Sequence, residues 1–152
     1  MQLNKDLREF VELLNSNRVE YLIVGAFAVA YHGFPRYTGD LDILVRPSPE
    51  NARRILNVLS EFGFGGLGVR DYDLEAPGKV IQLGVSPNRI DLVTAISGLT
   101  FDEAWASREP GELDGVPVPF IGRSALIHNK ESTGRAKDRG DAEELRRRAQ
   151  EH

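Results

Sequence analysis

The chain of 152 residues contains no cysteine. It therefore has neither a disulfide framework nor a thiolate metal site, and its three scattered histidines argue against a zinc site. No apolar run approaches the roughly 20 residues of a membrane span. The first ten residues, MQLNKDLREF, lack the apolar core of a signal peptide. We therefore expect a cytoplasmic protein that makes no contact with a membrane.

An excess of positive charge is also missing, because the formal net charge is −4. This balance argues against a protein that coats nucleic acid nonspecifically. Basic residues nevertheless gather near the carboxyl end, at Arg135, Lys137, Arg139 and 146–148. A local basic patch is thus compatible with the sequence, although the last three arginines also fit the solvated face of a helix.

Helical and alternating apolar patterns follow one another along the chain. They predict helices at 3–15, 26–32, 49–62 after a Ser48 cap, 101–106, from 124 onward and at 136–149. They predict strands at 20–24, 40–45, 79–83 and 89–93, and a hairpin within 112–120 around Asp114–Gly115. The fold class expected is α/β (α+β), one domain over 1–152 with a mixed sheet of about four to five strands flanked by helices. Its charged C-terminal helix would span about 136–149.

Two aspartates interrupt the apolar strand GDLDILV, and a third lies in the similar context RIDLV. Side chains alternate along a strand, so Asp40 and Asp42 face one side together, and Asp91 faces away from Ile90 and Leu92. If the two strands are neighbours, three carboxylates converge. At about 5 Å and an effective dielectric of about 20, each pair repels by roughly 3 kcal/mol. Such a cluster requires cations.

Magnesium is the cation that best suits this cluster. It takes oxygen ligands, commonly one or two carboxylates plus substrate phosphates. Two such ions could clamp the attacking and leaving oxygens of a phosphoryl or nucleotidyl transfer. The alternative is that the carboxylates have structural roles within the protein, with Asp40 capping a strand, Asp42 paired to Arg36 and Asp91 paired to Arg89.

The order of these elements resembles that of the nucleotidyltransferase superfamily, which has the DNA polymerase β-like fold. The matching pieces are the strand-to-glycine junction LIVGA at 22–26, Asp40–Leu41–Asp42 after thirteen residues, and the later Asp91. The stretch HGFPRYTGDLDILV and the tail LIHNKESTGRAKDRGDAEEL are most similar to small bacterial nucleotidyltransferases related to AbiEii-type toxins. The resemblance spans residues 21–145.

The resemblance implies a role for each matching residue. Asp40 and Asp42 would bind two magnesium ions, and Asp91 would complete the metal site and help to deprotonate an acceptor hydroxyl. Gly25 and the backbone N–H of Ala26 would hold the triphosphate of the substrate at the start of a helix. The family usually has Gly-Gly or Gly-Ser at these two positions, and Ala26 keeps the N–H but lacks a hydroxyl.

Further basic and polar residues would serve the phosphates. Arg36 and Thr38 would lie beside the phosphates or brace the aspartates, although Thr38 fits a turn-stabilising role equally well. Lys130, Arg135 and Lys137 could supply the positive charge that a triphosphate needs, because such catalysis is mostly positioning and electrostatics.

The tail also allows structural roles for its charged residues. Lys137 and Asp141 have the i, i+4 spacing of an ordinary ion pair on a helix surface. Asp138 matches the tail motif of the family, in which it would brace a basic residue rather than bind metal.

The function implied is magnesium-dependent transfer of a nucleoside monophosphate from a nucleoside triphosphate to an acceptor hydroxyl. The acceptor could be an RNA end such as that of a tRNA, a protein side chain, or a small molecule such as an antibiotic. A toxin-type activity would imply a neutralising antitoxin partner. The alternative, favoured by Ala26, is a relative that binds a nucleotide or a partner protein without catalysis. Phosphohydrolase chemistry, with water as acceptor, ranks last because the chain lacks a His-Asp pair.

Overall fold

The computed structural model describes residues 3–35, 39–63 and 68–149. Within these ranges the chain forms seven helices and six strands. The helices are α1 (Lys5–Ser16), α2 (Gly25–Tyr31), α3 (Pro49–Phe62), α4 (Tyr72–Glu75), α5 (Phe101–Ala106), α6 (Arg123–Ser132) and α7 (Ala136–Ala149). The strands are β1 (Tyr21–Val24), β2 (Leu41–Val45), β3 (Val80–Leu83), β4 (Ile90–Val93), β5 (Glu109–Leu113) and β6 (Val116–Phe120). None of these helices has both the length and the apolar character of a membrane span.

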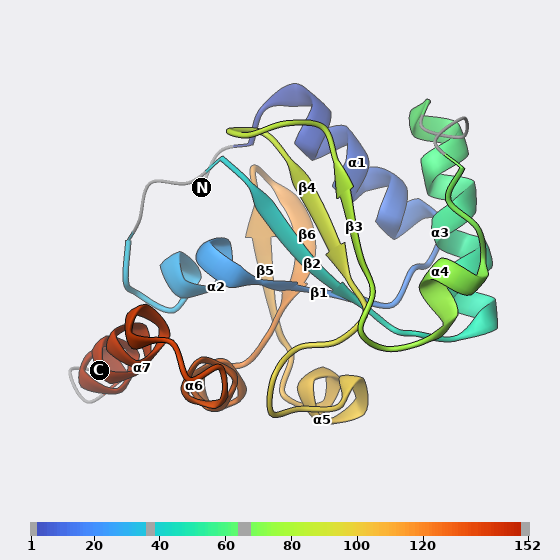
Figure 1. The fold of residues 1–152 in the computed structure, drawn as a ribbon. Coiled ribbons are helices and arrows are strands. Elements are labelled where there is room, and N and C mark those ends of the chain that lie inside the picture. Colours follow the sequence, from blue (N-terminus) through green and yellow to red (C-terminus); the bar gives the residue numbers. More distant parts are fainter. Residues whose placement is uncertain (1–2, 36–38, 64–67, 150–152) are drawn as a thin grey trace.

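All six strands join one mixed sheet in the order β3-β4-β2-β1-β6-β5. The pairs β2–β4 and β1–β6 are parallel, and the other three pairs are antiparallel. Helices cover both faces, with α6 and α7 side by side on the face that also carries α2 (Figure 1). The predicted α+β class with a mixed sheet is confirmed.

Both arms of the predicted hairpin belong to the sheet, which brings it to six strands. β6 pairs with β1 through Ile23 and Phe120, so β5 becomes the outer strand. The turn between the arms places Asp114 and Gly115 at φ 50° and 79°. Two consecutive left-handed residues are typical of a two-residue hairpin turn, and Asp-Gly is a preferred sequence for it.

Local capping determines where α3 begins and ends. The Ser48 hydroxyl accepts a hydrogen bond from the Asn51 N–H at 3.2 Å, and Pro49 occupies the first turn. Gly63 ends the helix in the left-handed conformation. The predicted Ser-Pro start is therefore confirmed.

The one-turn helix α4 was not predicted from the sequence. Asp71 accepts a hydrogen bond from the Tyr72 N–H, and Leu74 is fully buried in the core. A single apolar residue in four residues has no periodicity to detect, so only the tertiary contact identifies this turn.

Asn51 links α3 to the strands that carry the site. It is 2% exposed, and its Oδ1 accepts a hydrogen bond from the Glu20 N–H at 2.8 Å. Its Nδ2 donates to the carbonyls of Glu20 and Arg46, at 3.0 and 3.1 Å. The start of β1 and the end of β2 are thus held to one buried amide.

We expect Asn51→Ala to lower the free energy of unfolding by about 2 kcal/mol, because it leaves the Glu20 N–H without its partner and removes one of the two hydrogen bonds that each of the Glu20 and Arg46 carbonyls accepts. Chemical denaturation measures this loss. Asn57→Ala, on an exposed position of the same helix, is the matched control and should cost less than about 1 kcal/mol. Equal losses for both variants would contradict the role of Asn51.

Candidate active site

The turn from β1 into α2 has no room for a side chain. Gly25 follows Val24 directly and adopts φ +65°, a left-handed conformation that other residues rarely adopt. A Cβ on Gly25 would also overlap the carboxylate of Asp42. β1 and β2 are antiparallel, with Val24 opposite Asp42, so this carboxylate lies beside the first residue of α2. Both space and backbone conformation therefore require glycine here.

Asp42 and Asp91 lie opposite each other on two neighbouring strands. β2 and β4 run parallel, and their register pairs these two residues directly. Their neighbours in sequence are buried in the core on the other face of the sheet: Leu41, Ile43, Ile90 and Leu92. The register confirms that the two carboxylates share one face, as the alternating pattern predicted.

Asp42 is the carboxylate whose charge is least compensated. Burial raises its pKa to about 6, and a hydrogen bond with Asp91 and the charges of Asp91 and Asp40 act in the same direction. Lys130 opposes the shift. A proton shared between neighbouring carboxylates is the usual result of bringing like charges together. A bound cation would relieve the same repulsion.

Asp91 is held by an arginine from its own strand segment. The Arg89 guanidinium donates to both carboxylate oxygens of Asp91, at 2.7 and 3.0 Å, and Asp91 is 8% exposed. The ion pair that was the alternative to a metal site is therefore present for Asp91. The other proposed pair cannot be followed, because Arg36 lies outside the described residues.

Asp40 sits just before β2 and is bound to the β3–β4 loop. Its Oδ2 accepts a hydrogen bond from the Ser86 hydroxyl at 2.7 Å, and its Oδ1 accepts one from the Arg89 N–H at 2.9 Å. The bond from Ser86, followed by that from the Arg89 backbone, lowers the pKa of Asp40. Asp40 is therefore ionised both at neutral pH and at pH 6. At pH 6 a large share of Asp42 is protonated.

The wall opposite the sheet is basic and rests on two buried carboxylates. Lys130, on α6, lies 3.2 Å from Asp138 and 3.4 Å from Asp141, which are 5% and 3% exposed. The Thr133 hydroxyl and the Arg135 guanidinium each donate to Asp138 at 2.7 Å. Burial alone would raise the pKa of Asp138, but these partners outweigh it and lower the pKa. Asp138 thus contacts the basic residues, as the tail motif implied.

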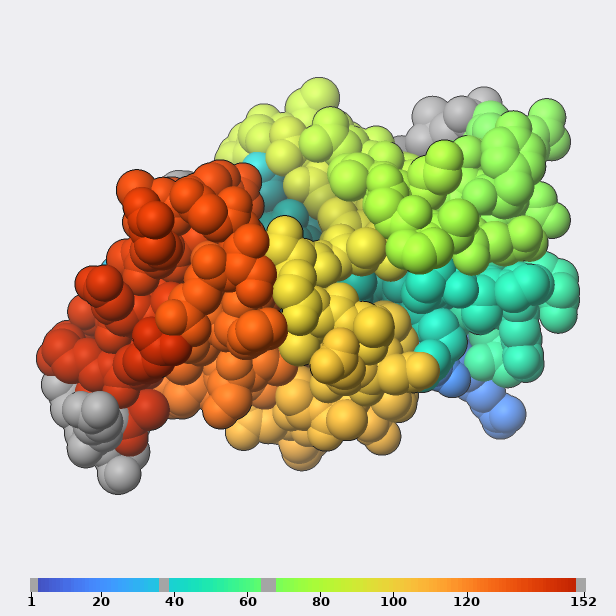
Figure 2. Space-filling view, turned by 60° about the horizontal axis from the view of Figure 1, so that its bottom comes forward, coloured from blue at the N-terminus to red at the C-terminus, as the bar shows by residue number. Residues whose placement is uncertain are grey.

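A cleft lies between the sheet and this wall. Figure 2 shows the hollow between the orange α6 and the yellow-green β3–β4 side. Its narrower part, of about 250 Å³, is lined by Gly25, Ala26, Asp42, Lys130, Arg135, Lys137 and Asp138. Six predicted phosphate- or metal-binding residues thus meet in one cavity, and Asp40 and Asp91 flank Asp42. Thr38, like Arg36, lies outside the described residues.

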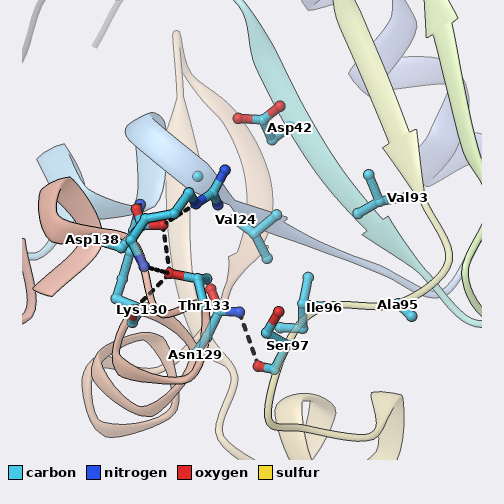
Figure 3. A pocket seen from close by; sticks show the side chains of 12 residues that line it. Val24, Asp42, Val93, Ala95, Ile96, Ser97, Asn129, Lys130, Thr133 and Asp138 are labelled. Atoms are coloured by element: carbon cyan, nitrogen blue, oxygen red, sulfur yellow. Dashed lines mark hydrogen bonds and ion pairs between the residues drawn. The ribbon is translucent and has the colours of Figure 1, made fainter.

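The wider part of the cleft, of about 670 Å³, extends from Asp42 to the loop after β4. Ile96 and Ser97 line it from this loop, and Asn129 and Thr133 line it from α6 (Figure 3). Sequence reasoning did not identify these four residues. Asn129 immediately precedes Lys130, and this adjacency is the only local signal of its position.

The donor set allows magnesium but does not form a complete cage. Among the described residues, no three acidic or histidine side chains are grouped closely enough to hold a metal ion by themselves. Asp42, with its raised pKa, and Asp40 are adjacent oxygen donors, and magnesium takes its remaining ligands from phosphates and water. The carboxylates therefore fit an ion that arrives together with a phosphate ligand.

The chain matches no protein-family model and no curated protein sequence. Its fold is similar to that of TM1012 from Thermotoga maritima, a protein assigned to the nucleotidyltransferases. The two are 21% identical with a TM-score of 0.61, over 96% of this chain and 91% of TM1012.

Two further solved structures share the fold. The lincosamide antibiotic adenylyltransferase LnuA is 14% identical with a TM-score of 0.56, over 94% of this chain and 96% of LnuA. The resistance factor ANT(2'')-Ia is 14% identical with a TM-score of 0.56, over 92% of this chain and 80% of its own. The chain therefore has the nucleotidyltransferase fold, as its sequence pattern implied.

The raised pKa of Asp42 has a direct consequence for stability. The folded protein keeps this proton up to about pH 6, whereas the unfolded chain loses it near pH 3.8. In EDTA, the free energy of unfolding should therefore fall as pH rises through this window, by up to about 3 kcal/mol at about 1.4 kcal/mol per pKa unit. Asp42→Asn should remove most of this decline and raise the Tm at pH 7.5.

Asp40→Asn is the matched control, with the opposite expectation. Because the folded-state pKa of Asp40 is lowered, its carboxylate stabilises the fold at neutral pH and loses that effect as pH falls. The Asp40 variant should therefore be less stable than the wild type at pH 7.5. A lower Tm for Asp42→Asn, with an unchanged pH profile, would contradict the assignment of the raised pKa to Asp42.

Proposed function

We propose that this protein is a magnesium-dependent nucleotidyltransferase. An acceptor hydroxyl oxygen attacks the α-phosphorus of a nucleoside triphosphate, and a new P–O bond forms as the bond to pyrophosphate breaks. The hydroxyl proton passes to a carboxylate, for which Asp91 is the candidate, and pyrophosphate leaves with the bonding electrons. Atoms and charge balance without any further reactant.

One observation carries the proposal: Asp42, a carboxylate with a raised pKa, faces a wall of cations across a cleft. A protein gains nothing in stability from placing Asp42 against Asp91, since like charges at this distance repel. Above about pH 6, where Asp42 loses its proton, a cation bound to Asp42 would relieve this repulsion. Magnesium bound to a triphosphate supplies that cation and also brings anionic oxygens for Lys130, Arg135 and Lys137.

Magnesium would be held by Asp42 and Asp40, with Asp91 completing the site. When bound, it would neutralise charge that develops on the α-phosphate. Arg89 now donates to both oxygens of Asp91 and therefore competes with a metal ion for this carboxylate, which keeps a lone pair on each oxygen. Arg89 is half-exposed and lies at 4.0 Å from Asp40, so it has an alternative carboxylate partner nearby.

The triphosphate would occupy the narrow part of the cleft. Lys130 and Lys137 supply positive charge there, and Gly25 leaves the backbone open beside Asp42. The N–H of Ala26 would serve as a phosphate donor, and Arg36 and Thr38 remain predicted phosphate residues. This division gives most of the catalytic effect to positioning and charge, as is usual in phosphoryl transfer.

The acceptor class follows from experiment rather than from the fold. LnuA is an adenylyltransferase of lincosamide antibiotics, so a small hydroxylated molecule is one class to test. An RNA end and a protein side chain are the others, and a toxin activity with a neutralising partner stays a prediction. Transfer of label from an α-labelled nucleoside triphosphate to each class, in the presence of magnesium, identifies the acceptor.

Nucleotide binding is the first test of the proposed function. A thermal shift with each nucleoside triphosphate, with and without magnesium, should show stabilisation of about 2.7 kcal/mol at a hundredfold excess over Kd. Asp42→Ala should lose the magnesium-dependent shift, because the metal loses its central ligand. Glu61→Ala, exposed on α3, is the control and should behave as the wild type. An Asp42→Ala protein that still binds Mg-nucleotide normally would overturn the proposed site.

A further inference from the structure

Three directions lead away from the position where magnesium bound to Asp42 would hold an α-phosphate. An in-line displacement at the α-phosphorus needs the pyrophosphate on one side and the acceptor hydroxyl on the opposite side. The nucleoside must therefore extend from the phosphorus in a third direction. The basic residues Lys130 and Arg135 occupy the first side, which is the pyrophosphate side.

The opposite side is open for an acceptor. There Asp91 pairs with Gln82 on the outer strand β3, and Gln82 is exposed. Val80, on the same face of β3, is 61% exposed, so no described helix covers this part of the sheet. An acceptor can therefore approach Asp91 without crossing the phosphate wall.

The third direction is the wider part of the cleft. In Figure 3 it extends from Asp42 past Val24 and ends at Ile96, Ser97 and Asn129. The wider part shares Lys130, Arg135 and Asp138 with the phosphate end. Away from these residues its lining is mainly apolar, and Ser97, Asn129 and Thr133 are its polar residues. A nucleotide has the same division between a flat, largely apolar base and charged phosphates, so the cleft matches it end to end.

The far end of this cleft is held firmly in shape. Gly98 adopts φ +83°, and a Cβ there would overlap the Ser132 side chain and lie 3.2 Å from the His128 ring. The loop after β4 therefore packs directly on α6. Asn129 links the two elements again, because its Nδ2 donates to the Ser97 carbonyl at 3.0 Å.

This hydrogen bond also determines how Asn129 is oriented. A carbonyl can only accept, so the NH₂ group of Asn129 points to Ser97 and Oδ1 is the other end of the amide. Among the residues that the structure describes, none donates to this Oδ1. Asn129 thus offers a fixed acceptor at the nucleoside end of the cleft.

We infer that this end is the nucleobase subsite and that Asn129 selects adenine and cytosine, the bases with an amino group rather than a carbonyl at C6 of the purine or C4 of the pyrimidine. The inference rests on the proposed function. The amino group of these bases donates to Oδ1 of Asn129. Guanine and uracil place a carbonyl oxygen at the same position, where two acceptors would face each other without a proton, and such polar mismatches are discriminated strongly.

Calorimetric titration with magnesium and non-hydrolysable α,β-analogues of the four nucleotides tests this inference. The wild type should bind the adenine and cytosine analogues about tenfold more tightly than the others, since one hydrogen bond is worth about that factor. Asn129→Ala should abolish the preference. Magnesium tripolyphosphate, which has no base, should bind both proteins equally.

Two further variants locate the subsite. Ser97→Trp fills the exposed end of the cleft and should weaken all four nucleotide analogues but not tripolyphosphate. Ser124 is exposed on α6, the helix that carries Asn129, and lies outside the cleft. Ser124→Ala should change neither the binding of the nucleotide analogues nor that of tripolyphosphate.

The outcomes separate this inference from the proposed function. Tripolyphosphate binding without any base preference, or a preference that survives in Asn129→Ala, would overturn the base subsite alone. If tripolyphosphate and all four analogues fail to bind the wild type, the proposed function falls and the subsite falls with it.

Discussion

The parallel pairing of β2 with β4 places one carboxylate directly against another, and the rest of the site depends on this contact. Asp42 and Asp91 share a face because of the register between their strands, and a slip of either strand by one residue would turn its aspartate into the core. The contact costs free energy in the absence of a cation, which is why burial and its neighbours raise the pKa of Asp42 to about 6. The fold therefore retains an unfavourable pair of charges at the mouth of a cleft, where a bound ligand can relieve it.

The surrounding residues balance this charge without removing it. Arg89 neutralises Asp91 through two hydrogen bonds, and Asp40 is tied to the β3–β4 loop through Ser86. On the other wall, Lys130 is held by two buried carboxylates, so it faces the cleft from a fixed position. Asp42 is left between these groups with the least compensation, and a metal–phosphate ligand would complete the balance from both walls.

Short-range patterns made much of this structure predictable. Alternation in GDLDILV and RIDLV predicted the faces of the aspartates, and Ser48–Pro49 and Asp114–Gly115 predicted a helix start and a hairpin turn, because each depends on neighbours in sequence. The ion pair of Arg89 with Asp91 could be predicted only as an alternative to a metal site, because the sequence does not show whether Asp91 contacts Arg89 or a metal ion. The contact of Asn129 with Ser97 joins residues 32 apart and depends on how α6 packs, which no local pattern encodes.

Direct titration of the Asp42 carboxyl by NMR, with and without magnesium and a non-hydrolysable nucleotide, tests the central claim. Because Asp42 and Asp91 interact, the pair should show an apparent pKa near 6 in EDTA that is absent from Asp42→Asn. Magnesium with nucleotide should move that titration to well below its metal-free value, since the cation favours the ionised form. An Asp42 carboxyl that titrates near pH 4 in both conditions would contradict the account, because the metal-free site would then contain no carboxylate repulsion for a metal–nucleotide complex to relieve.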